Sequence, residues 1–268
     1  MPLPASSLTA SDLSLIQQLA DAAGAAVRPY WRADFGLETK SDATPVTLAD
    51  RASEAAIRAL LEKERPSDGI IGEEYGTVRE GAARQWVIDP IDGTTSFVAG
   101  RPIFGTLIAL MVDGWPVLGL IDQPILCERW VGSAGHGTTF NGKPVRTRDC
   151  ADLKEAILAT SGPSYFTPKE GDHFMALAKK TAHRRLIWGG DCYNYGLLAS
   201  GHIDLVVEAG LKIHDLAALV PVVEGAGGMM CDWNGDPLHA ESHGDVIALG
   251  DPARLEDVLE ALADREGP

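Results

Sequence analysis

Residues 86–97 read WVIDPIDGTTSF and place two carboxylates, Asp89 and Asp92, where an apolar run stops. Pro90 and Gly93 bend the chain between and after them, so both side chains can point at one place. Two close carboxylates raise each other's pKa unless a cation lies between them, and hard oxygen ligands favour Mg²⁺. The segment predicts a magnesium site; the alternative is that the two acids only cap a helix and complete a turn.

Three further features support the metal interpretation. If a helix starts after Gly93, its free amide groups would face the same place and could hold a phosphate oxygen. Glu73 follows a short apolar run, and Asp215 opens an apolar helix. Taken singly, a glutamate after a strand is usually solvated and a helix-start aspartate is usually a cap.

The elements around this segment predict an α+β organisation for residues 1–150. Helical spacing of apolar residues predicts a helix over 11–30, and Thr47 to Asp50 has the form of a capping box that starts a second helix ending near 64. The predicted strands, of which the last three suggest an antiparallel meander, cover residues 70–71, 85–88, 104–112, 115–121 and 128–131.

After residue 150 the pattern alternates between strands and helices, which is typical of an α/β organisation. The expected strands cover residues 156–160, 185–188, 203–207, 228–231 and 245–249. The expected helices cover residues 169–182, 193–200, 214–226 and 251–264. We therefore expect an α+β half, 1–150, that carries most of the metal ligands and an α/β half, 151–268, that carries the substrate residues and the last ligand.

Composition excludes several classes of function. The 268 residues are 45% hydrophobic with a net charge of −15, which fits a globular protein and disfavours nucleic acid and anionic membranes as partners. Residues 104–112 form the longest apolar stretch, too short to span a bilayer. The N-terminus lacks a signal peptide pattern, so we expect a cytoplasmic protein. The spacing of the cysteines predicts reduced, mostly buried thiols at Cys127, Cys150, Cys192 and Cys231.

Four motifs in this order resemble the inositol monophosphatase family of Mg²⁺-dependent, lithium-sensitive phosphomonoesterases. They are TLAD at 47–50, IGEE at 71–74, WVIDPIDGTTSF at 86–97 and HDLAALVPVVEGAGG at 214–228. The resemblance spans about residues 11–262. It implies a layered α-β-α-β-α sandwich, a homodimer, a small phosphate monoester as substrate, and metals held between the two halves.

The resemblance also implies a role for particular residues. The metal ligands would be Glu73, Asp89, the backbone carbonyl of Ile91, Asp92 and Asp215, holding two or three Mg²⁺ ions. A metal-activated water would attack the phosphate. Thr94 would orient and deprotonate that water with support from Asp50, and Glu73 would contribute through a second water and metal. Lys40 and Ser41 fall in the family's mobile loop. His214 departs from the aromatic residue usual at that position.

The second half of the site looks most like the histidinol-phosphatase branch of the family, on residues 188–196 and 201–208. Glu208 matches the position that contacts the substrate's alcohol, and Asp191 stands where inositol-type members have a small residue. Two acids suit the amine and imidazole of L-histidinol phosphate, which would place the enzyme in histidine biosynthesis. Gly93, Thr94 and Gly190 complete the expected substrate contacts. The alternative for Asp191 is a helix N-cap.

Other functions remain open. Within the family, the substrate could instead be inositol 1-phosphate, fructose 1,6-bisphosphate, 3'-phosphoadenosine phosphate or a range of sugar and polyol phosphates. An enzyme of the haloacid dehalogenase type, which forms an aspartyl-phosphate, is disfavoured because its acids stand two residues apart, whereas Asp89 and Asp92 stand three apart. A metal-binding interaction protein that has lost activity is disfavoured because every expected ligand type is present.

Overall fold

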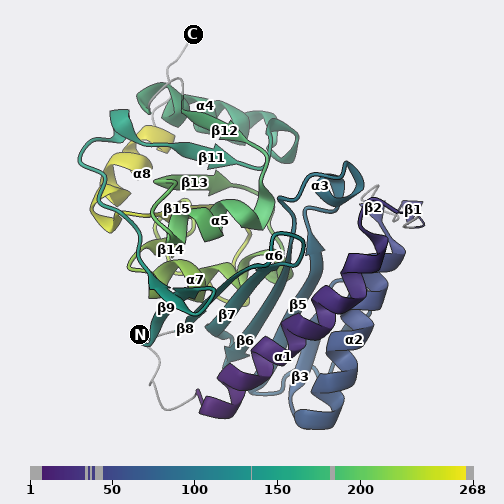
Figure 1. The fold of residues 1–268 in the computed structure, drawn as a ribbon. Helices are drawn as coiled ribbons and strands as arrows, with labels where there is room; N and C mark the ends of the chain where they lie inside the picture. Colours follow the sequence, from purple (N-terminus) through teal and green to yellow (C-terminus); the bar gives the residue numbers. More distant parts are fainter. Residues whose placement is uncertain are drawn as a thin grey trace.

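The computed structural model describes residues 8–33, 36, 38–39, 45–133, 135–181 and 185–263. Two β-sheets and the helices packed on them form the molecule (Figure 1). A short pair of strands, β1 (Glu38–Thr39) and β2 (Pro45–Val46), lies apart from both sheets. The predicted loop residues Lys40 and Ser41 lie outside the described residues.

The larger sheet has eight strands in the order β10-β9-β8-β7-β6-β5-β3-β4. Neighbouring strands pair antiparallel throughout, except that β3 and β5 are parallel. The predicted antiparallel meander is therefore confirmed. The strands are β3 (Gly69–Gly72), β4 (Gly76–Val78), β5 (Arg84–Asp92), β6 (Gly105–Val112), β7 (Trp115–Gln123), β8 (Glu128–Ser133), β9 (Gly137–Phe140) and β10 (Lys143–Val145).

Two helices, α1 (Ala10–Val27) and α2 (Leu48–Glu64), cover one face of this sheet (Figure 1). Both begin with a capping box, Thr9 with Asp12 and Thr47 with Asp50, which satisfies amide groups that the first helical turn leaves free. Their apolar faces pack on the sheet in one buried cluster that includes Leu19, Ile57, Trp86, Ile108 and Leu120. The second capping box was predicted from the sequence and is confirmed.

The smaller sheet has five strands in the order β12-β11-β13-β15-β14. They are β11 (Leu158–Thr160), β12 (Leu186–Trp188), β13 (Leu205–Glu208), β14 (Met229–Cys231) and β15 (Val246–Leu249). The first three are parallel, as an α/β organisation requires, but β15 is antiparallel to both β13 and β14. The purely alternating expectation is wrong here because residues 232–245 join β14 to β15 without a helix, and an antiparallel pair needs no helical crossover.

The remaining helices give the molecule five layers. The helices α5 (Asp191–Ala199) and α7 (Leu219–Gly225) lie between the sheets, in one buried cluster with β6, β7, β13 and β15. The helices α4 (Pro168–Lys180) and α8 (Leu255–Ala263) cover the outer face of the smaller sheet (Figure 1). The α-β-α-β-α sandwich is confirmed. Because one core cluster joins both sheets, a division into domains at residue 150 stays a prediction.

The predicted helix over 214–226 is two helices, α6 (Ile213–Leu216) and α7. Pro221 gives the physical reason, since it has no amide hydrogen to donate to the carbonyl of Ala217. The break lets the chain pass close to the larger sheet. A Cβ atom on Gly119 of β7 would clash with the carbonyl oxygen of Ala218, and one on Gly132 of β8 would clash with that of Pro221. These glycines let α7 sit directly on the strands.

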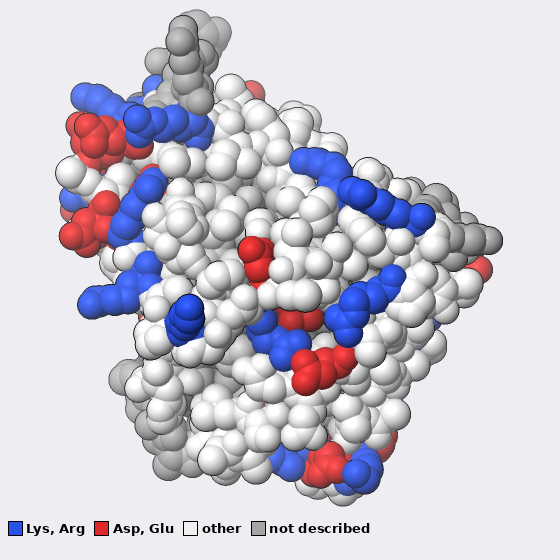
Figure 2. Space-filling model, in the orientation of Figure 1, with Lys and Arg blue, Asp and Glu red and all other residues white. Residues whose placement is uncertain are grey.

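The surface carries charges of both signs. In the face drawn in Figure 2, acidic and basic side chains occur next to one another along the edge formed by α4 and α8. All four cysteines are free thiols, and three of them are buried, as predicted. Among the described helices, none combines the length and the apolar character that a bilayer crossing would need.

Candidate active site

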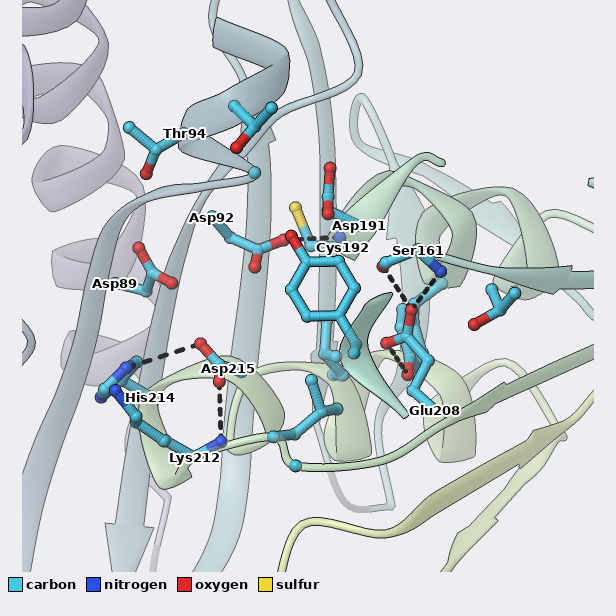
Figure 3. Close-up of a pocket in the computed structure, with 18 of the residues that line it drawn as sticks. Asp89, Asp92, Thr94, Ser161, Asp191, Cys192, Glu208, Lys212, His214 and Asp215 are labelled. Carbon is cyan, nitrogen blue, oxygen red and sulfur yellow. Dashed lines mark hydrogen bonds and ion pairs between the residues drawn. The ribbon is translucent and has the colours of Figure 1, made fainter. Parts of the chain in front are cut away.

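A cavity of about 260 Å³ lies between the two sheets. Residues from both halves of the chain line it. Figure 3 shows Asp89, His214 and Asp215 at one end, Glu208 with Ser161 at the other, and Asp92 beside Cys192 between them. The cavity therefore has acidic side chains at both ends.

The end of β5 brings Asp89 and Asp92 to the same side of the strand. Asp89 pairs with Leu107 and Asp92 with Gly105, so β5 contains one more residue than β6 over this stretch, a β-bulge. Residues three apart on a regular strand would point to opposite faces. The amide of Ile91 donates to Asp89 Oδ1 at 3.0 Å, which fixes the bulge. The backbone irregularity thus creates the paired carboxylates.

Asp215 completes a group with these two acids. Carboxylate oxygens of Asp89, Asp92 and Asp215 all lie within 4.8 Å of one another. Each of the last two also accepts a backbone hydrogen bond: Cys192 N donates to Asp92 Oδ2 at 2.5 Å, and Lys212 N donates to Asp215 Oδ2 at 2.7 Å. The two helix starts therefore hold the acids in place while other oxygens face the cavity.

A second group shares Asp89 with the first. Ligand atoms of Glu73, Asp89 and His214 also lie within 4.8 Å of one another. Glu73 follows β3, which runs parallel to β5, so the two strands end side by side. His214 was noted in the sequence only as a departure from an aromatic residue. Nothing in the spacing indicated its place, because Glu73 and His214 come together only through the fold.

Burial makes these carboxyl groups costly to ionise without a cation. It raises the pKa of Asp89 well above its usual range, and the carboxylates of Glu73 and Asp92 raise it further. Burial likewise raises the pKa of Asp92, with Asp191 adding to the effect, and the pKa of Asp215. A group of buried oxygens with raised pKa values fits a divalent cation, which would favour their ionised forms.

Thr94 opens α3 (Thr94–Val98), so a helix does start after Gly93, which was the condition for a phosphate site at these amides. Its hydroxyl donates to the carbonyl oxygen of Ile91 at 3.1 Å, which brings together two of the predicted site residues. Asp50 lies on α2, where its Oδ2 accepts from Thr47 and its buried Oδ1 has no hydrogen-bond partner. Burial raises the pKa of Asp50 to about 6.

Asp191 lies directly against the loop that carries the paired acids. Gly93 has a φ of +81°, and a Cβ atom there would lie 2.6 Å from Asp191 Oδ2. The helix N-cap is Gly190, at a φ of +127°, and Asp191 is the first helical residue, so the capping alternative for Asp191 is wrong. Its carboxylate instead accepts from Ser96 Oγ at 3.2 Å and faces the cavity.

Glu208 is held at the end of β13 by two neighbours. Its carboxylate accepts hydrogen bonds from the amide and hydroxyl of Ser161 and from Tyr195 Oη, the last at 2.8 Å. Burial raises the pKa of Glu208. Ser161 was not predicted from the sequence, although its position directly after a buried strand marks it as a residue at the strand end. Tyr195 is buried and forms part of the cavity wall.

Fold and site together define a layered α-β-α-β-α protein with an acidic cavity suited to a divalent cation. A model of the inositol monophosphatase family matches residues 10–265, so the chain belongs to this family. Its members are metal-dependent phosphatases, which makes a phosphoric monoester hydrolase the class of enzyme.

Named relatives differ in their substrates. The chain is 45% identical over 253 residues to the bifunctional phosphatase IMPL2 of Arabidopsis thaliana, covering 91% of this chain and 72% of the relative. It is 37% identical to a histidinol-phosphatase of Chlorobaculum parvum, covering 88% and 92%. A solved inositol monophosphatase structure from Zymomonas mobilis is 52% identical, with a TM-score of 0.88 over 96% of this chain and 100% of that one.

Proposed function

We propose that the protein is a Mg²⁺-dependent phosphatase that hydrolyses L-histidinol phosphate to L-histidinol and inorganic phosphate. The observation that carries the proposal is a further pair of acids in the cavity: Glu208, at the end away from Asp89 and Asp215, and Asp191, beside the loop that carries Asp92. Relatives named histidinol-phosphatase support it. A neutral polyol gives these two acids no counter-charge, whereas an amine and an imidazole do.

In this proposal the acids at the Asp89 end of the cavity hold the metal ions, and the ions hold the phosphate. Asp89, Asp92, Asp215, the Ile91 carbonyl and Glu73 would be the ligands. Bound Mg²⁺ supplies an activated water and neutralises charge on the phosphoryl oxygens. The residues named above supply position, because the β-bulge and the helix starts fix their side chains before substrate arrives.

Thr94 and Asp50 would orient the attacking water and accept its proton. The Thr94 hydroxyl stands at the start of α3 beside the Ile91 carbonyl, where it can orient a water molecule. Asp50 offers a buried carboxylate oxygen without a partner and a pKa of about 6, which suits a proton acceptor near neutral pH. Water adds to phosphorus, the ester oxygen leaves as the alcohol of histidinol, and the proton balance is closed by solvent.

The first experiment compares phosphate release from L-histidinol phosphate with release from inositol 1-phosphate, fructose 1,6-bisphosphate and 3'-phosphoadenosine phosphate at saturating Mg²⁺. A preference of about tenfold or more for histidinol phosphate, equal to about 1.4 kcal/mol of transition-state binding, supports the proposal. A flat profile contradicts it. A preference for inositol 1-phosphate would favour the second candidate function, that of an inositol monophosphatase. The 52% identity to the inositol monophosphatase of Zymomonas mobilis supports this second candidate.

The variant Asp191→Asn tests whether the charge of Asp191 contributes to substrate recognition. Asp191 has a φ of +43°, a backbone conformation that asparagine tolerates and alanine does not, so the substitution removes the charge and keeps the fold. We expect kcat/KM for histidinol phosphate to fall at least about tenfold, while hydrolysis of an aryl phosphate, whose leaving group carries no positive charge, changes by less than about threefold. Equal losses on both substrates would remove Asp191 from substrate recognition.

A further inference from the structure

His214 is the nitrogen-bearing member of the two metal-type groups. Its side chain is 13% exposed, and Nε2 lies 3.5 Å from Asp215 Oδ1. It stands on α6 next to Asp215, so the same short helix supplies one residue to each group. Figure 3 shows the imidazole at the Asp89 end of the cavity. The imidazole therefore lies close to the carboxylates of Glu73, Asp89 and Asp215, where it could bind an ion as well as line the cavity.

The two groups differ in the chemistry of their donor atoms. Asp89, Asp92 and Asp215 offer only oxygen, which suits Mg²⁺. Glu73, Asp89 and His214 offer two carboxylates and one imidazole nitrogen. Imidazole is a poor ligand for Mg²⁺ and a good one for first-row transition ions. Because Asp89 belongs to both groups, it can bridge two ions of different kinds.

We propose that His214 supplies a nitrogen ligand to an ion held with Glu73 and Asp89, and that this position selects Mn²⁺ over Mg²⁺. The inference rests on the proposed metal-dependent function and specifies the cofactor of one position within it. The carboxylate of Asp215 can orient the ring through one nitrogen and leave the other for the ion, a common arrangement around metal-bound histidine.

The test is pulsed electron paramagnetic resonance of Mn²⁺ added to tag-free protein, at one and two equivalents and with Mg²⁺ present. We expect a ¹⁴N coupling from a directly bound imidazole, replaced by a ¹⁵N coupling when the protein is made with ¹⁵N-labelled histidine. The variant His214→Asn should lose the coupling and bind Mn²⁺ about tenfold more weakly, with Mg²⁺ affinity changed by less than about threefold. The control His202→Asn, at a turn after α5, should keep the coupling.

Three outcomes would overturn the proposal. They are Mn²⁺ bound without nitrogen coupling at either stoichiometry, equal loss of Mn²⁺ and Mg²⁺ affinity in His214→Asn, or no binding of Mn²⁺ by the folded protein. These readouts use no substrate, so their failure is distinct from that of the proposed function. Hydrolysis of histidinol phosphate with Mg²⁺ alone would leave that function standing even if His214 binds no ion.

Discussion

Asp92 links the two halves of the cavity at the scale of one side chain. It ends β5 of the larger sheet, and its Oδ2 accepts a hydrogen bond from an amide in the first turn of α5, at Cys192. Its carboxylate also belongs to the all-oxygen group. One residue therefore caps a helix and faces the cavity, so the turn-and-cap interpretation and the metal interpretation of this aspartate describe two oxygens of the same side chain.

Asp92→Asn separates these two roles. The amide oxygen of asparagine can still accept from Cys192, whereas the charge that would hold a cation is gone. We expect turnover to fall by more than about a thousandfold, because a metal-held transition state is lost. The free energy of unfolding of the metal-free protein should stay within about 1 kcal/mol of wild type in urea titrations. Near-normal phosphate release from this variant would contradict the assignment of Asp92 as a metal ligand.

The sequence predicted those site residues whose position is determined by residues close to them along the chain. The paired acids, the helix after Gly93 and the capping box at Thr47 all follow from short-range geometry, and each is present. The neighbourhood of His214 and the contacts of Ser161 with Glu208 could not be predicted in this way. They join residues 47 to 141 positions apart, and only packing brings such residues together.

At the scale of elements, the fit of α7 on the larger sheet depends on glycine. Gly119 and Gly132 leave no side chain between the strands and the backbone near Ala218 and Pro221. The sequence pattern indicated one apolar helix over 214–226. Its break follows from Pro221, but the close approach of the backbone to β7 and β8 could not be predicted, because it depends on which strands lie beneath. The same break sets the position of α6 and therefore of His214 and Asp215.

Gly119→Ala should destabilise the protein by about 1–3 kcal/mol, because its Cβ atom would overlap backbone that cannot move freely. Urea denaturation of the metal-free protein measures the effect. The control is Gly171→Ala on α4, where the nearest atom to a Cβ would be 3.9 Å away and alanine favours the helix, so its stability should stay equal or rise. Equal stability of wild type and Gly119→Ala would show that α7 can shift at little cost.

For the whole molecule, the acids of the cavity set how stability depends on pH. The pKa of Asp50 is about 6 in the folded protein against 3.8 as its ordinary value, and Asp89, Asp92 and Asp215 are raised in the same direction. The folded state then binds more protons than the unfolded state, so these groups lower stability as pH rises through this range. For Asp50 alone the effect is on the order of 3 kcal/mol.

We therefore expect the metal-free protein to have a lower Tm at pH 7.5 than at pH 5. Mg²⁺ should raise the Tm more at pH 7.5, because it binds the ionised carboxylates. Calorimetry with chelator and with Mg²⁺ at both pH values measures this. The variant Asp50→Asn should show a smaller fall between the two pH values. A metal-free Tm that rises from pH 5 to pH 7.5 would contradict the assignment of raised pKa values to these buried acids.

The contact between Gly93 and Asp191 has a consequence for attempts to redesign substrate preference. Asp191, whose side chain is proposed to recognise the substrate, packs against the backbone at Gly93, which is proposed to position the reacting phosphate. There is no space between them for one added methyl group. A longer residue at position 191 would push on that loop and disturb catalysis together with selectivity. Libraries that change preference should therefore hold positions 93 and 191 to their present sizes and vary the cavity mouth, where Tyr165 is 57% exposed.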